Sequence, residues 1–131
     1  MPDAPSERRV GAEEGFGREL RLVDGEQFRA VFADALRHGG KGLLLLVRPN
    51  GLDHPRLGLA IARKHVRRAV GRNRIKRQAR ESFRLSRQWL GGVDLIVLSR
   101  PGVAEMERDA IRRELERLWR RAATATQPQG R

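Results

Sequence analysis

The sequence contains no cysteine among its 131 residues, which excludes disulfide bonds, thiolate metal sites and a cysteine nucleophile. It also lacks long apolar runs, because the longest covers only residues 43–47, far short of the ~20 residues that cross a bilayer. The first 17 residues contain no apolar segment of the kind found in secretory signals. We therefore expect a soluble, cytoplasmic protein of one domain, with no membrane partner.

Acidic residues are few relative to basic ones, and the imbalance is concentrated in one segment. The chain has 28 Lys and Arg against 16 Asp and Glu, a net charge of +12. Residues 62–87 hold 11 of the basic residues and one acid, Glu81, so this fifth of the chain carries a net charge of +10. A charge run can simply be a solvated helix face, but repulsion within so dense a block costs folding free energy. Because guanidinium groups fit phosphates and stack on bases, the block favours nucleic acid as the partner.

The N-terminal half predicts an arm, one helix and two strands. Residues 1–17 have no periodicity and are typical of a mobile arm. A helix should begin at Asp24, with Gln27 completing a capping pattern, and end at Gly39 and Gly40. Its apolar stripe would contain Phe28, Val31, Phe32, Ala35 and Leu36. Two apolar runs, residues 43–48 and 57–62, flank turn residues and predict an antiparallel pair of strands.

The C-terminal half predicts a helix, a strand and a second helix. Over residues 72–89, helical spacing places Ile75, Ala79 and Phe83 on an apolar face, beside a face of basic residues. Residues 93–99 predict a strand and residues 104–122 a helix, followed by a frayed tail at residues 123–131. The order α-β-β-α-β-α predicts an α+β fold: one small α/β sandwich over residues 18–122, with a sheet of about four strands and three helices.

Few residues could support catalysis by the protein itself. The three histidines, His38, His54 and His65, have no second histidine at the spacing of helical metal ligands. The acids at 13–14 and 105–109 fit solvation and the helix dipole better than metal binding. We therefore expect no catalytic side chain and no metal bound by the protein alone. The alternatives to an RNA-dependent role are a general RNA-binding module such as a ribosomal protein, a protein-only nuclease, and a DNA-binding basic helix.

One segment resembles the protein subunit of bacterial ribonuclease P: RLGLAIARKHVRRAVGRNRIKRQARESFRL, residues 56–85. The similarity lies in a strand that ends in the basic pair Arg63 and Lys64, a short linker, and a helix opened by RNRIKR at residues 72–77. It continues in FGRELRLVDGEQFRAVF before this segment and in VDLIVLSRPGVAEM and LWRR after it, and so covers about residues 16–121.

The resemblance implies a role in tRNA processing, in a ribonucleoprotein that is an endonuclease and hydrolase. The protein would bind the catalytic RNA and the 5′ leader of precursor tRNA, and the holoenzyme would remove the leader. The active site and its Mg²⁺ ions would belong to the RNA. The sequence leaves the oligomeric state of the RNA-free protein open.

The resemblance and the charge block together predict the residues that contact RNA. Contacts with the catalytic RNA are expected from Arg63, Lys64, Arg67, Arg68, Arg72, Asn73, Arg74, Lys76, Arg77 and Arg80. Asn73 could instead cap the helix. The resemblance also implies a leader-binding cleft between the first helix and the sheet, and the predicted lining is Phe28, Phe32, Leu46 and Arg63. The two phenylalanines could alternatively be core residues, although an exposed ring edge could stack on a base.

Overall fold

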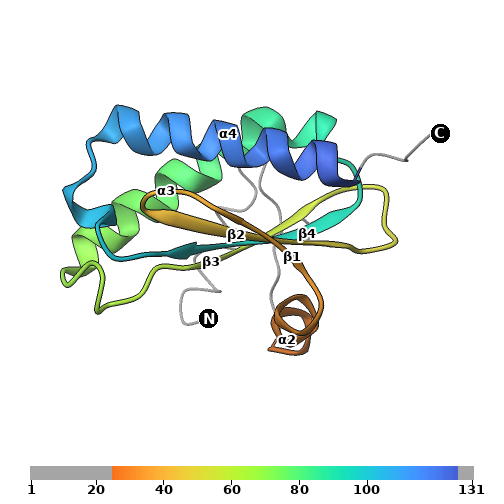
Figure 1. Ribbon diagram of the computed structural model, residues 1–131, viewed down its shortest axis with the longest axis horizontal. Helices are drawn as coiled ribbons and strands as arrows, with labels where there is room; N and C mark the ends of the chain where they lie inside the picture. The colour runs from red at the N-terminus through yellow and green to blue at the C-terminus, as the bar shows by residue number, and fades with distance from the viewer. Residues whose placement is uncertain (1–24, 127–131) are drawn as a thin grey trace, which may run out of the picture.

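The computed structural model describes residues 25–126 and arranges them in three layers (Figure 1). The sheet in the middle contains β1 (Leu36–Gly39), β2 (Leu43–Pro49), β3 (Arg56–Ala60) and β4 (Val93–Ser99). Helix α2 (Gly25–Ala33) covers one face of the sheet, and α3 (Ala69–Ser86) and α4 (Arg108–Thr126) cover the other. The 3₁₀ turns η2 (Arg87–Trp89) and η3 (Val103–Glu105) follow α3 and precede α4. The predicted α+β sandwich of about four strands and three helices is confirmed, whereas the predicted arm at 1–17 lies outside the described residues.

The strands lie in the order β1-β2-β4-β3. Strand β4 is antiparallel to β2 and parallel to β3, so it separates these two strands. The prediction that residues 43–48 and 57–62 pair with each other is therefore wrong. The composition of β4 explains its central place, because VDLIVLS is buried along nearly its whole length and a strand covered on both faces belongs inside a sheet.

Strand β1 occupies residues that helical spacing had assigned to the first helix. Helix α2 ends at Ala33, and Leu36–Gly39 pairs with β2 in an antiparallel hairpin. The predicted continuation of the helix to Gly39 is therefore wrong. Leu36 is 52% exposed and so contributes little to a core, whereas pairing with β2 satisfies the backbone of both strands.

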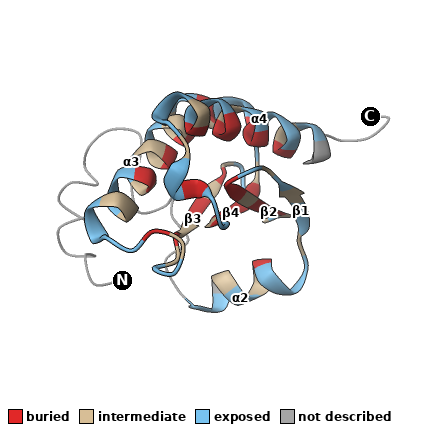
Figure 2. Cartoon of the chain, turned by 60° about the vertical axis from the view of Figure 1, so that its left-hand side comes forward, coloured by how far each residue is buried: buried red, intermediate tan, exposed pale blue. Residues whose placement is uncertain are grey.

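Two hydrophobic cores hold the layers together, one on each face of the sheet (Figure 2). The larger core lies between the sheet and helices α3 and α4. In this core the rings of Phe83 and Trp119 pack edge to face, with their centroids 5.9 Å apart. Trp119 Nε1 also donates a hydrogen bond to Ser82 Oγ at 2.7 Å. The smaller core lies under α2 and contains Val31, Leu46 and Ile96. Burial of α3 and α4 on the same side of the sheet leaves their outer faces to solvent.

Helices α3 and α4 begin or end at other residues than the sequence predicts. Helix α3 begins at Ala69, three residues before the predicted start at 72. Helix α4 begins at Arg108 and runs to Thr126, past the predicted limit of the domain at residue 122. Among the described residues, no helix combines the length and the apolar character needed to cross a membrane.

Candidate nucleic-acid interface

The basic linker, residues 61–68, joins β3 to α3 and is held against the end of β4. The backbone N–H of Ala62 donates to Ser99 Oγ at 2.8 Å, and His65 Nδ1 lies 2.7 Å from the same oxygen. The N–H groups of His65 and Val66 both donate to the carbonyl of Ala62, which closes a turn. The path of the linker is therefore set by its hydrogen bonds to Ser99 of β4 and by the turn that it closes within itself.

Arg72 stabilises the second half of this linker. Its Nη1 donates to the carbonyl oxygens of Val66 at 3.0 Å and Arg67 at 2.9 Å. Helical geometry explains why, because Arg72 lies about 60° from Ile75 around α3, at the edge of the buried face. Arg72 thus has a structural role that its predicted assignment as an RNA contact did not include. These hydrogen bonds use Nη1 and leave Nε and Nη2 as possible donors to phosphate.

The predicted RNA contacts come to the surface together. In α3, the face toward the core contains Ile75, Ala79, Phe83 and Ser86. None of the ten predicted contacts is buried. Seven of them are exposed: Arg63, Lys64, Arg67, Arg68, Asn73, Arg74 and Arg77. The other three, Arg72, Lys76 and Arg80, are partly buried along the flank of the helix. We call the basic linker and the solvent-facing basic residues of α3 together the basic ridge; it follows β3, which is an edge strand of the sheet.

Asn73 does not cap the helix. The N-cap residue of α3 is Arg68, whose backbone is extended and whose side chain makes no capping hydrogen bond. Asn73 lies more than a full turn further on, with an exposed side chain. The structure therefore excludes the cap, and contact of Asn73 with RNA stays a prediction.

Within residues 25–126, few carboxylates pair with the positive charges of the basic ridge. Glu81, the one acid in this part of the sequence, pairs with Arg84 at 2.5 Å. Arg80 has an interaction of its own, but none of the other nine predicted contacts forms an ion pair with a described carboxylate. A dense set of exposed guanidinium and ammonium groups without carboxylate partners is the electrostatic pattern of a phosphate-binding surface.

The predicted leader-binding residues are divided between the surface and the small core. Phe32 is 50% exposed on α2, and Arg63 is exposed beyond the end of β3. Phe28 is partly buried, with its ring seated on Gly58 of β3: a Cβ built on that glycine would lie 2.6 Å from Phe28 Cζ. Leu46 is 1% exposed beneath α2. Leu46 packs there with Val31 of α2 and with Ile96, its partner on β4, so in this structure it belongs to the small core rather than to an exposed lining.

A row of partly buried side chains lies beside Leu46 on the same face of the sheet. Pairing aligns Leu44 with Leu98 and Leu98 with Ala60 across the sheet. By strand alternation these three side chains face the same side as α2, and all three are only partly buried. They lie on the side of α2 from which β3 leads toward Arg63. The alternation of small and large residues in RLGLAIA was the sequence signal for this row, but only the strand order shows which residues share it.

A buried ion pair fixes the opposite end of the same sheet face. Asp94 is 3% exposed and accepts hydrogen bonds from Arg56 Nε and Nη2, each at 2.9 Å. Asn50 Nδ2 donates to the same carboxylate at 2.9 Å. Because both charges are paired and hydrogen-bonded, this network positions β3 against β4 and is not a reactive site. Within residues 25–126 no group of three or more histidine, aspartate and glutamate side chains gathers as metal ligands.

Comparisons with known proteins agree with this arrangement. The model of the ribonuclease P family matches residues 16–123. The chain is 50% identical over 109 residues to the ribonuclease P protein component of Azotobacter vinelandii, covering 82% of this chain and 84% of the relative. This chain belongs to the ribonuclease P protein family. The corresponding protein of Ectopseudomonas mendocina is 51% identical over 110 residues, covering 83% of this chain and 82% of the relative.

Solved structures of ribonuclease P proteins share the fold. The Staphylococcus aureus protein superposes with a TM-score of 0.74 at 27% identity, covering 79% of this chain and 94% of that one. The Thermotoga maritima protein gives a TM-score of 0.70 at 30% identity, covering 77% and 96%. Membership of the family makes this chain the protein component of a ribonuclease P, with ribonuclease P RNA as its partner and a role in an endoribonuclease that processes tRNA.

Proposed function

We propose that this protein binds the catalytic RNA of ribonuclease P through the basic ridge. The ridge offers six exposed cations, Arg63, Lys64, Arg67, Arg68, Arg74 and Arg77, on the basic linker and the first turns of α3. Their lack of described carboxylate partners is the observation that carries the proposal. If each cation neutralises one phosphate, the log–log dependence of binding on salt should have a slope of roughly −4 to −5.

The 5′ leader of precursor tRNA is proposed to lie on the other face of the sheet, beside α2. The exposed ring of Phe32 offers a stacking surface, and the row of Leu44, Leu98 and Ala60 offers apolar contact. Arg63 lies near the end of this row and belongs also to the basic ridge. One strand end would therefore connect the RNA-binding surface to the leader-binding surface.

The chemistry of leader removal is assigned to the RNA. The described side chains gather no cluster of metal ligands, and Ser99, whose Oγ lies 2.7 Å from His65 Nδ1, is buried and holds the basic linker, so no catalytic step is derived for the protein. The Mg²⁺ ions required for cleavage are proposed to be held by the RNA. The protein contributes affinity and positioning, which raise the fraction of substrate held in a productive geometry.

The test is reconstitution of cleavage with ribonuclease P RNA and a precursor tRNA at low Mg²⁺. The wild-type protein should raise the cleavage rate, and the Arg74→Gln/Arg77→Gln variant should need a higher protein concentration for the same effect. Arg112→Gln is the matched control, because Arg112 is an exposed arginine on α4 that pairs with Asp109 and Glu116. An unchanged requirement for the double variant, or cleavage by the protein without RNA, would contradict the proposal.

The leader contact is tested separately with two precursor tRNAs that differ only in leader length. The Phe32→Ala variant should weaken binding of the substrate with the long leader and leave the substrate with a single-nucleotide leader unaffected. Stacking on one aromatic side chain contributes about 1–3 kcal/mol per base, so the loss should be at least fivefold. Equal effects on both substrates would place Phe32 outside the leader-binding surface.

A further inference from the structure

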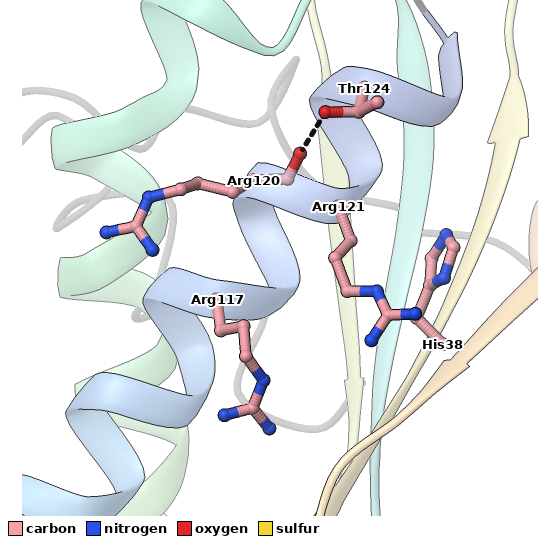
Figure 3. A pocket seen from close by; sticks show the side chains of 5 residues that line it. All are labelled: His38, Arg117, Arg120, Arg121 and Thr124. Carbon is pink, nitrogen blue, oxygen red and sulfur yellow. Dashed lines mark hydrogen bonds between the residues drawn. The ribbon is translucent and has the colours of Figure 1, made fainter.

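A cationic recess, distinct from the basic ridge, lies at the opposite edge of the sheet. Its volume is about 340 Å³, and its lining consists of His38, Arg117, Arg120, Arg121 and Thr124. His38 belongs to β1, which is one edge strand, whereas the basic linker leaves β3, the other edge strand. The four remaining residues come from the last turns of α4 (Figure 3). The recess is therefore separate from the surfaces assigned above.

The lining carries positive charge and contains no acid. Arg117 and Arg121 are one turn apart on α4, and both extend toward β1 in Figure 3, with the guanidinium of Arg121 beside the His38 ring. Like charges at this spacing destabilise a helix by a few tenths of a kcal/mol. The nearest acid is Glu114, 3.7 Å from Arg117. Its two oxygens already accept hydrogen bonds from the backbone N–H groups of residues 41–43 at 2.9–3.1 Å.

His38 contributes a buried nitrogen that lacks a hydrogen-bond partner. Nε2 of His38 is shielded from solvent and has no partner within the described residues. Burial lowers the pKa of His38, and the nearby charge of Arg121 lowers it further. The ring is therefore neutral near pH 7 and can donate one hydrogen bond to an anion. A buried polar nitrogen without a partner is unfavourable by itself, and a bound ligand would supply what is missing.

We propose that this recess, His38 with Arg117 and Arg121, is a second RNA-binding site that takes a backbone phosphate. An anion fits the charge, and paired guanidinium groups suit a phosphate oxygen pair. The choice of RNA as the source of the phosphate rests on the proposed function, since the partner of this family is a large RNA. With sites at both edges of the sheet, one RNA or two would contact opposite sides of the protein.

The first measurement is binding of ribonuclease P RNA and, separately, of precursor tRNA over a range of salt concentrations. The Arg117→Gln/Arg121→Gln variant should bind its RNA roughly 3–10-fold more weakly than wild type, with a salt slope smaller by about 1. Arg112→Gln on the other side of α4 should change neither quantity. The RNA whose binding is weakened identifies the source of the phosphate. Wild-type affinity and slope for both RNAs would overturn the proposal.

The second measurement reports on the recess directly and does not depend on ribonuclease P activity. The ring nitrogens of His38 are followed by NMR in the ¹⁵N-labelled full chain, with the His38→Gln variant as assignment control. A short RNA oligonucleotide should shift the His38 signals saturably in wild type, and much less in the single variant Arg121→Gln, which keeps Arg117 and its contact with Glu114. No shift in wild type overturns the proposal even if the protein activates ribonuclease P RNA. A saturable shift supports it even if that activation fails.

Discussion

Replacement of Arg72 and of Arg74 should separate two functions of the RNRIKR motif, namely stabilisation of the fold and binding of RNA. Nη1 of Arg72 makes two hydrogen bonds to linker carbonyls, at 3.0 and 2.9 Å. Each such bond stabilises a protein by about 0.5–1.5 kcal/mol, and one of these lies in an exposed position, so Arg72→Gln should lower the free energy of unfolding by about 1–2 kcal/mol. For a domain of this size, the melting temperature should fall by roughly 3–8 °C. Arg74→Gln removes an exposed arginine and should leave the unfolding transition within ~0.5 kcal/mol of wild type.

The assay is urea denaturation followed by circular dichroism, with RNA binding measured on the same samples. Arg74→Gln should reduce the salt slope of binding by about 0.7–0.9, as expected for one lost phosphate contact. Arg72→Lys is the informative third variant, because lysine keeps the charge but not the planar fork that reaches two carbonyls. It should be destabilised nearly as much as Arg72→Gln. Equal unfolding free energies for Arg72→Gln and Arg74→Gln would refute the structural role of Arg72.

Three further changes test other parts of the structure. Glu114→Gln should lower the free energy of unfolding by about 2–4 kcal/mol, measured by urea denaturation, because an amide cannot accept all the hydrogen bonds that the buried carboxylate receives from residues 41–43. Gly58→Ala should cost about 1–3 kcal/mol in the same assay, because its Cβ would lie 2.6 Å from Phe28 Cζ and displace α2; a wild-type value would mean that this helix is not seated on β3. The pKa of His38 is lowered by burial, so the unfolded chain takes up a proton near pH 6.5 before the folded protein does. Stability should therefore fall as the pH drops below about 6.5, and His38→Gln should flatten that part of the pH profile.

The spacing of apolar residues was sufficient to predict the elements that are buried along their whole length or along one continuous face. The apolar run of Val93–Ser99 matches β4 residue for residue. Helical spacing from Ile75 to Phe83 correctly assigned the buried face of α3. In both cases the pattern directly reflects the face that packs against the rest of the protein.

Features that depend on strand pairing, or on contacts between segments that are separated in the sequence, could not be predicted from this spacing. The four residues of β1, LRHG, have no alternation and become a strand only because β2 offers an edge. Leu46 is buried because α2 packs on the sheet at its position, whereas Leu44, two residues earlier on the same face, remains partly exposed. Arg72 looked identical to Arg74 in the motif, and only the path of the linker distinguishes the two arginines. Each of these outcomes depends on where another segment of the chain lies.

The hydrogen bonds of Ser99 and Arg72 have a consequence for the energetics of RNA recognition. A free loop of several residues would lose conformational entropy when it docks, at roughly 1–2 kcal/mol for each residue whose backbone becomes fixed. Here that loss occurs during folding, since both ends of the basic linker are already attached to the domain. The RNA would meet a rigid array of charges, and more of the electrostatic attraction would remain as net affinity.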